Sequence, residues 1–351
     1  MLAMALPAQA GAAATPSRRI LFAAGDSIFS VRPDGDGYRK LASGSTSFAP
    51  VWSPNKQHIA FTRHEGSVGS VWVMKADGSD ERVLAENGDS PSWSPDGDRL
   101  VYVRRAGVTD PFATGDALVT VAIDGTQESV VAEAEGRLES PQWSPDGAEI
   151  AFVAGMPTDD GDPTTFDEDN LDIYKVVLET EEIVRLTEDL HRDEDPRWSP
   201  DGNRLAFVSD RDDERCGEGS DGCPYTTEIY LMEPDGSSEK RFTHNALHHD
   251  RNPEWAPDGR ALVWNRTTDD DVNTSCCNAE IVLKAVDGSR SRLLTKDDRF
   301  DLDPSFSPGG FWVVFMSYRE GGLPDLYKMR IDGSDRARIT STGRAESAPD
   351  W

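Results

Sequence analysis

The chain has 351 residues, with 36 Lys and Arg against 64 Asp and Glu, so its formal net charge is -28 at pH 7. Such a surface repels phosphate backbones and anionic lipid headgroups, which argues against binding of nucleic acid. Beyond the first 17 residues no stretch approaches the roughly 20 apolar residues that span a bilayer, so direct membrane insertion is not expected either.

The first 17 residues differ from the rest of the chain. They are rich in Ala and contain the step Ala8-Gln9-Ala10. This pattern is typical of the end of a secretory signal, with cleavage after Ala10, although a disordered leader on a cytosolic protein has the same composition. We predict residues 1–17 to be a signal remnant or leader and residues 18–351 to be one domain.

One sequence unit occurs seven times. It begins with Pro-x-Trp-Ser-Pro-Asp-Gly, continues through two apolar runs separated by turns, and ends in a basic-apolar-Thr step. The spacing between successive aromatic residues varies from 41 to 57, and the variation falls where loops belong. The aromatic residues of the unit are Trp52, Trp93, Trp143, Trp198, Trp255, Phe306 and Trp351.

The apolar runs are short and rich in β-branched and aromatic residues, as in His58-Ile59-Ala60-Phe61. Both alternations are apolar, which indicates strands covered on both faces. Ser-Pro-Asp-Gly and the later Asp-Gly pairs have the chemistry of tight turns, and the third unit turns through Glu179-Thr180-Glu181-Glu182 instead.

Four short antiparallel strands per unit, repeated radially, predict an all-β, seven-bladed β-propeller. Residues 348–351 supply the innermost strand of the last blade, while residues 19–42 supply its other three. We therefore expect the C-terminal strand to pair with the N-terminal strands and close the ring. The repeated Trp residues are expected to stabilise the contacts between blades.

The run Ile229-Tyr230-Leu231-Met232, followed by Asp235-Gly236, together with the repeated Trp-Ser-Pro-Asp-Gly, resembles the repeat of TolB-like propellers. Similar propellers accompany prolyl oligopeptidase-type peptidases and tricorn-like proteases. The resemblance implies a platform for protein binding in the bacterial envelope.

No catalytic residues are predicted. The chain lacks the Gly-x-Ser-x-Gly elbow, the His-Glu-x-x-His metal motif and the P-loop fingerprint. We expect a protein without enzymatic activity.

The polar residues of blades three to six form the candidate binding site. The connections between blades are expected to emerge on the same face as those between the second and third strands. Residues just before the repeat Pro should then lie side by side around the channel mouth. The candidate ligand- or partner-binding residues are His191, Asp193, Asp195, His248, His249, Asp250, Asn252, Asp301 and Asp303.

A divalent cation is one alternative for this site. His191, His248 and Asp303 combine imidazole and carboxylate groups, which suit transition metals, whereas carboxylates alone suit calcium. The acidic inserts at 159–172 and 269–271 could also hold calcium weakly. The other interpretation is that these residues solvate loops and turn the chain. No other cofactor is expected.

The four cysteines lie in equivalent inserts of adjacent blades, Cys216 and Cys223 in one and Cys276 and Cys277 in the next. Two bridges between the inserts, one bridge within each insert, or a thiolate metal site all fit the sequence. Export favours disulfides.

These observations predict a monomeric propeller in the periplasm, the cell envelope or the secreted fraction. It would bind another protein or a cell-envelope polymer through blades three to six. The alternatives are a metal-assisted polysaccharide lyase or hydrolase and a sensor domain of a longer protein.

Overall fold

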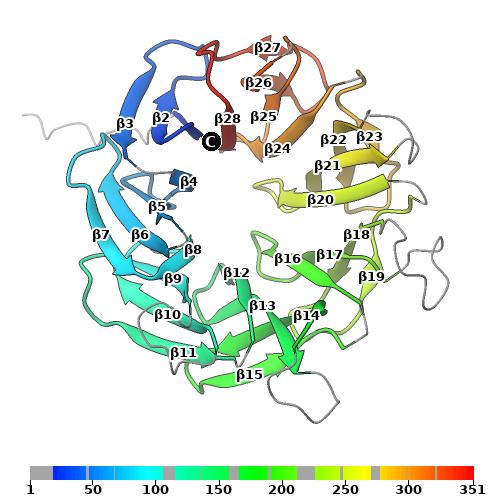
Figure 1. The fold of residues 1–351 in the computed structure, drawn as a ribbon. Helices are drawn as coiled ribbons and strands as arrows, with labels where there is room; N and C mark the ends of the chain where they lie inside the picture. The colour runs from blue at the N-terminus through cyan, green and yellow to red at the C-terminus, as the bar shows by residue number, and fades with distance from the viewer. Residues whose placement is uncertain are drawn as a thin grey trace, which may run out of the picture.

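A computed structural model describes residues 19–351 apart from 45–46, 67, 106–114, 135, 158–165, 189–190, 212–225, 246–247, 270–276, 298 and 321. Seven sheets of four antiparallel strands surround a central axis (Figure 1). No helix occurs among the described residues. The predicted all-β, seven-bladed propeller is therefore confirmed.

Each blade runs from an innermost strand at the axis to an outermost strand at the rim. Blades one to three consist of β4 (Ser47–Trp52), β5 (His58–Glu65), β6 (Val68–Lys75), β7 (Arg82–Glu86), β8 (Gly88–Trp93), β9 (Arg99–Arg104), β10 (Ala117–Ala122), β11 (Ser129–Glu133), β12 (Leu138–Trp143), β13 (Glu149–Pro157), β14 (Phe166–Val177) and β15 (Glu182–Arg185).

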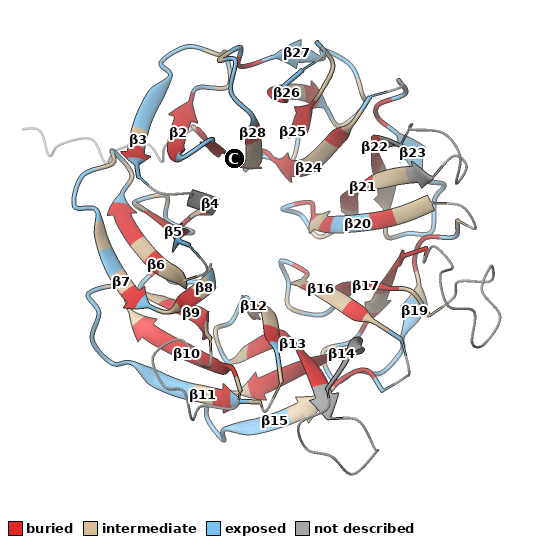
Figure 2. Cartoon of the chain, viewed as in Figure 1, coloured by how far each residue is buried: buried red, intermediate tan, exposed pale blue. Residues whose placement is uncertain are grey.

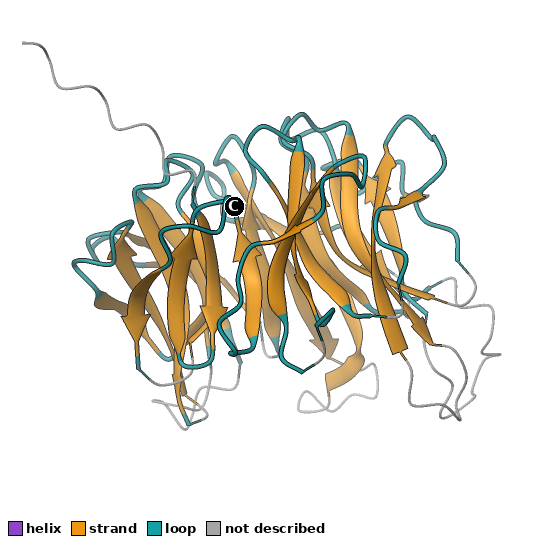
Figure 3. Ribbon diagram, turned by 90° about the horizontal axis from the view of Figure 1, so that it is seen from above, coloured by secondary structure: helices purple, strands orange, loops and turns teal. Residues whose placement is uncertain are grey.

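Blades four to six have the same order of strands. They consist of β16 (Asp193–Trp198), β17 (Leu205–Ser209), β18 (Glu228–Met232), β19 (Lys240–Arg241), β20 (His248–Trp255), β21 (Ala261–Asp269), β22 (Cys277–Ala285), β23 (Arg292–Leu293), β24 (Asp301–Phe306), β25 (Trp312–Ser317), β26 (Asp325–Arg330) and β27 (Ala337–Arg338). The strands stand side by side around the ring, with connections at both faces (Figure 3).

Blade seven joins the two ends of the chain. Its order is β28 (Glu346–Asp350), β1 (Ile20–Ala24), β2 (Ser27–Val31) and β3 (Arg39–Ser43). Strand β28 pairs antiparallel with β1, with Leu21 opposite Asp350. The predicted closure of the ring is confirmed.

The hydrophobic core consists of layers between neighbouring blades. Trp143 of blade three, for example, packs in one cluster with Val101 and Leu118 of blade two. Buried residues fill the middle strands, whereas outer strands such as β3 and β11 carry exposed stretches (Figure 2). Six of the seven repeat aromatics are buried, with 5% of Trp52 and 4% of Phe306 exposed, and Trp198 is partly buried against the same layers, so they belong to the core as expected.

The Ser-Pro-Asp-Gly turns of blades two, three and four close the first hairpin by the same contacts. The Ser94 hydroxyl donates to Asp96 Oδ1 at 2.6 Å and accepts from the Arg99 N–H at 2.9 Å. Gly97 has a φ of +75°, which glycine adopts without steric cost. Since the turn uses only local groups, its recurrence in the sequence was enough to predict it.

Candidate functional site

Every innermost strand carries a bulge at the residue before the repeat Pro. The ladder shifts register there, as between Glu194 and Arg197 in β16. The backbone at this position is left-handed in all seven blades, with φ between +43° and +54°. The seven residues are Ala49, Ser90, Ser140, Asp195, Asn252, Asp303 and Ala348. Asp and Asn tolerate this conformation better than most residues, which gives a local reason for their presence.

The side chains at this position meet around the axis. Asn252 Nδ2 donates to Asp303 Oδ1 at 3.1 Å, and the Ser140 hydroxyl lies 3.4 Å from Asp195 Oδ1. Burial raises the pKa of Asp303, although the Ala348 N–H and Asn252 oppose the rise. Asp195, Asn252 and Asp303 thus occupy equivalent positions on three adjacent inner strands, with Asn252 and Asp303 in contact, and their role in binding stays a prediction.

Three other predicted site residues, Asp193, Asp250 and Asp301, lie inside the blades. Asp193 and Asp301 begin innermost strands, Asp250 is the third residue of β20, and each is 0% exposed. An arginine from the adjacent strand region binds each carboxylate at 2.5 to 2.7 Å. The pairs are Asp193 with Arg211, Asp250 with Arg266 and Asp301 with Arg319. These buried carboxylates therefore have a structural role inside the blades.

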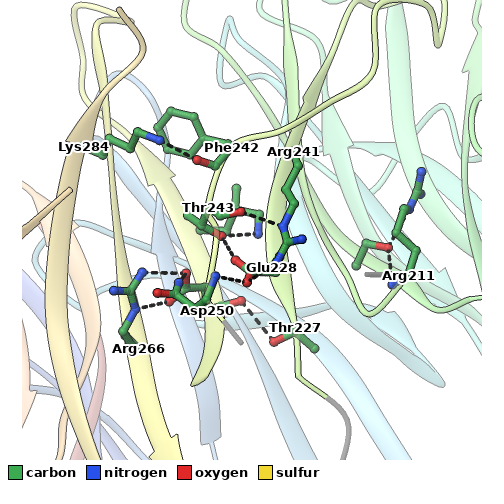
Figure 4. Close-up of polar contacts among 12 residues, drawn as sticks. Arg211, Thr227, Glu228, Arg241, Phe242, Thr243, Asp250, Arg266 and Lys284 are labelled. Atoms are coloured by element: carbon green, nitrogen blue, oxygen red, sulfur yellow. Dashed lines mark hydrogen bonds and ion pairs between the residues drawn. The ribbon is translucent and has the colours of Figure 1, made fainter. Parts of the chain in front are cut away.

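The pairs extend into polar networks that join neighbouring blades, and the network between blades four and five shows the pattern (Figure 4). The Thr243 hydroxyl accepts from the Ile229 N–H at 2.9 Å and donates to Glu228. Asn245 bonds Glu228 through its N–H and Asp250 through its side-chain amide, the latter at 2.7 Å. The basic-apolar-Thr step of the repeat therefore has a structural role in holding strand ends together.

Burial acts on the carboxylates of these networks. It raises the pKa of Asp193 to about 6, although Arg211 opposes the rise. Burial also raises the pKa values of Glu228 and Asp301, against hydrogen bonds from Thr243 and Ser317 respectively. For each group the loss of hydration outweighs the favourable partner.

Two of the three histidines, His248 and His249, are placed differently from the prediction. The sequence indicated blade-joining loops, but β20 begins at His248, so His248 and His249 are strand residues. They pair with Thr268 and Thr267, because β20 and its partner β21 are longer than the inner strands of most blades. His191 is exposed in the connection before β16.

His248 lines a cavity of about 380 Å³ with Arg266, Glu280, Lys296 and Asp297. In the described part of the chain, no three His, Cys, Asp or Glu side chains gather in an arrangement that could hold a metal ion. His191, His248 and Asp303 do not form such a set, and no chemistry is assigned to a metal or to calcium.

The cysteine prediction lies largely outside the described residues. This is true of Cys216, Cys223 and Cys276, while Cys277 is described only through its backbone in β22. Their pairing stays a prediction. The acidic insert at 159–172 is described only from Phe166, and its last residue, Asp172, is buried and bound by Arg185 at 2.6 Å.

An axial pocket of about 500 Å³ opens on the side of blades one to three. No motif in the sequence predicted this pocket. It is lined by Ala49, Val51, Thr62, His64, Asp89, Ser90, Pro91, Arg105, Ser140, Pro141, Gln142 and Arg197. The rim contains three of the left-handed residues, so the bulges shape the mouth of the pocket.

The guanidinium of Arg105 already has hydrogen-bond partners at the wall of this pocket. Its guanidinium binds Asp89 through Nε at 2.7 Å and Asp116 through Nη1 at 2.5 Å, and it donates to the Leu138 carbonyl at 2.8 Å. Arg105 thereby links blades two and three at the pocket wall.

The residue just before each repeat aromatic explains why the pocket lies on one side. In three blades this side chain accepts the N–H of the next aromatic along the ring. The contacts are Glu254 with Phe306 at 2.9 Å, Ser305 with Trp351 at 3.4 Å and Asp350 with Trp52 at 2.6 Å. Blades one, three and four carry Val51, Gln142 and Arg197 there, and all three line the pocket. Comparing the repeats at this one variable position could have revealed the pocket.

These features define a seven-bladed propeller with a polar pocket on its axis. Residues 89–217 match the model of the TolB β-propeller domain family. The repeat is of the TolB type, as the sequence resemblance predicted.

Among curated proteins, an uncharacterized peptidase, YuxL of Bacillus subtilis, is 27% identical over 175 residues. That match covers 42% of this chain and 24% of the peptidase, so the chain spans about a quarter of its length. The Tol-Pal system protein TolB of Anaeromyxobacter dehalogenans is 38% identical over 69 residues, covering 19% of this chain and 16% of that protein.

Among solved structures, TolB from Acinetobacter baumannii has a TM-score of 0.57 at 21% identity, covering 94% of this chain and 80% of its own. Oligogalacturonate lyase from Vibrio parahaemolyticus has a TM-score of 0.67 at 17% identity, covering 90% of this chain and 86% of its own. At these identities the likeness concerns the fold alone. None of the described residues forms a helix long and apolar enough to cross a membrane.

Proposed function

We propose that this protein is an exported, non-enzymatic TolB-like propeller that binds another protein at the face where the axial pocket opens. The observation that carries the proposal is the axial pocket itself. It has a volume of about 500 Å³ and is lined mainly by polar and small side chains. Concave sites with a few well-placed polar groups are the usual binding sites of rigid scaffolds.

The framework around the pocket supports a binding role. Arg105 is held by three groups. The rim residues lie in bulges, and the inner strand pairs with the second strand before and after each bulge, as β8 does with β9. A preorganised surface loses little conformational freedom when a partner docks. The TolB-type repeat and the Ala-rich leader favour an extracytoplasmic location. We propose that the protein is a monomer and that its partner is a protein. The metal-assisted lyase or hydrolase and the sensor domain stay alternative predictions.

The test uses two matched tryptophan substitutions. Gln142→Trp fills the axial pocket, whereas Gln57→Trp adds the same bulk to an exposed turn at the other end of the inner strands. Proteins captured from an envelope extract by the wild type are purified, and their affinities for all three forms are measured by calorimetry. We expect Gln142→Trp to weaken binding at least tenfold and Gln57→Trp to leave it unchanged.

Two results would contradict the proposal. One is a purified partner that binds Gln142→Trp as tightly as the wild type, which would place the interaction elsewhere. The other is the absence of any protein whose binding survives purification. Thermal melting of each variant establishes that the fold is retained.

A further inference from the structure

The lining of the axial pocket contains one cation that no lining carboxylate pairs, although the formal net charge of the protein is -28. Asp89 of the lining binds Arg105 through two hydrogen bonds of 2.7 and 3.0 Å, and Asp116 binds the same guanidinium at 2.5 Å. The remaining full charge in the lining is the guanidinium of Arg197.

Arg197 projects from the innermost strand β16 at the residue before Trp198. Its backbone carbonyl accepts the Trp255 indole N–H at 3.0 Å. Its guanidinium makes no ion pair within 4.0 Å to a carboxylate of the described residues, unlike Arg211, Arg266 and Arg319 on neighbouring strands. The side chain is half-buried, so part of its hydration is already lost.

The neighbouring carboxyl group does not cancel this charge. Glu254 lies in the next blade, and burial raises its pKa to about 8, against a smaller opposing effect of Arg197. At neutral pH Glu254 is therefore mostly protonated, and its Oε1 already accepts the Phe306 N–H at 2.9 Å. Arg197 keeps its donors for a group that enters the pocket.

We propose that Arg197 binds a carboxylate on a peptide segment of the protein partner, an acidic side chain or a chain end, inserted into the axial pocket. This inference rests on the proposed function. A guanidinium presents donors in a planar fork that matches the two oxygens of a carboxylate. Gln142 and Ser140, on the neighbouring inner strand, can bond the peptide groups beside it.

The lining favours a peptide over the other acids. Sugars pack their apolar faces on aromatic rings, and no Trp, Tyr or Phe is among the residues that line this pocket. Phosphate groups are usually bound by several cations, whereas Arg197 is one guanidinium in a strongly acidic protein. A single carboxylate adds the least repulsion from the surrounding negative field.

The test compares two blocked tripeptides that differ in one group, N-acetyl-Gly-Glu-Gly-amide and N-acetyl-Gly-Gln-Gly-amide. Binding to the wild type is followed by NMR titration at constant ionic strength. The Glu peptide is expected to bind and the Gln peptide to bind at least tenfold more weakly, because the neutral amide cannot form a charge-assisted pair with the guanidinium.

Arg197→Gln should abolish that preference, while Arg290→Gln, which removes one exposed positive charge elsewhere, should keep it. Arg197→Lys keeps the charge without the fork and should bind the Glu peptide with intermediate affinity. It also serves as the test variant if melting shows that Arg197→Gln does not fold, in which case wild-type affinity of Arg197→Lys for the Glu peptide would overturn the inference.

Equal binding of the two tripeptides would overturn the inference, as would digalacturonate binding through Arg197 more tightly than the Glu peptide. A partner lost on Gln142→Trp but unaffected by Arg197→Gln would uphold the proposed function and reject the carboxylate contact. An Arg197-dependent preference for the Glu peptide without any protein partner would support the pocket chemistry and reject the proposed function.

Discussion

Single residues with left-handed backbone shape the inner wall of this propeller. A left-handed conformation costs most L-residues roughly 1–2 kcal/mol, and Asn and Asp lose less because their side chains bond locally. Asn252 follows this rule, with its amide bonded to Asn265 at 3.0 Å and to Asp303 at 3.1 Å. Ala49, with a φ of +43°, has no such compensation.

We predict that Ala49→Gly stabilises the fold. Ala49 is exposed, so its methyl group contributes little burial, and glycine removes the steric cost of the positive φ. After the greater entropy loss of glycine is subtracted, the free energy of unfolding should rise by about 0.5–1 kcal/mol. Urea unfolding measures the change. Ala132→Gly, at the buried residue of the outer strand β11, should instead destabilise, and a loss of stability in Ala49→Gly would argue against strain at the bulge.

Glu254 predicts a pH dependence of stability. Because its pKa is raised to about 8, the folded protein keeps a proton that the unfolded chain releases near pH 4 to 5. The stabilisation is therefore complete below the unfolded pKa and is lost as the pH rises through about 8, at about 1.4 kcal/mol per pKa unit of difference. Glu254→Gln should flatten this fall between pH 5 and 9, as followed by urea unfolding.

The exposed Glu179→Gln is the control for the loss of one negative charge, and it should keep the wild-type slope. If Glu254→Gln also kept the wild-type slope, the carboxyl group of Glu254 would have to ionise with an ordinary pKa in the folded protein. The Arg197 inference would then lose one of its supports.

At the scale of strands, the Thr of each basic-apolar-Thr step ties an outer connection to the third strand. The hydroxyl oxygens of Thr187, Thr243, Thr295 and Thr340 accept backbone N–H groups at 2.8 to 3.0 Å. All four residues are buried. A buried N–H without a partner costs roughly 1–3 kcal/mol, so these bonds matter more than an average surface contact.

We predict that Thr243→Val lowers the free energy of unfolding by about 2 kcal/mol, since the Ile229 N–H and Glu228 both lose a partner while the volume is kept. Thr243→Ser retains the hydroxyl and should cost about 1 kcal/mol or less. Denaturant unfolding checks both. A larger loss for Ser than for Val would mean that the methyl group, and not the hydroxyl, is what the site requires.

The contrast between strands and site shows what the sequence could predict. Turns and apolar runs use local chemistry, so Ser94 to Gly97 and its equivalents identified the blades. Asp193 and Arg211 are 18 residues apart, and an acidic residue before a strand has the same sequence pattern whether it faces solvent or an arginine. Arg197 was missed because it lies at the one variable position beside the repeat aromatic, which belongs to no motif, and the ring geometry brings it into the pocket.

At the scale of the whole molecule, the ring depends on contacts between its first inner strand and its last residues. Asp350 Oδ2 accepts the Trp52 N–H at 2.6 Å. Lys56 Nζ lies 3.7 Å from Asp350 Oδ1 and donates to the Trp351 carbonyl at 3.1 Å. Lys56 has a φ of +55° in a turn where Gly97 stands in the next blade, so a lysine with left-handed backbone occupies a turn that contacts the end of the chain.

We predict that Asp350→Ala weakens closure by about 1–3 kcal/mol, because it leaves the Trp52 N–H without its acceptor. Lys56→Met should cost less than about 1 kcal/mol, and the double variant should show a coupling of about 0.5–1 kcal/mol in urea unfolding. The exposed Arg330 and Asp335 pair, 2.6 Å apart within blade six, is the control and should give a coupling near zero. Asp350→Ala should also speed proteolysis near β28, since the ring opens where its two ends meet; unchanged stability and cleavage would show that strand pairing alone keeps it closed.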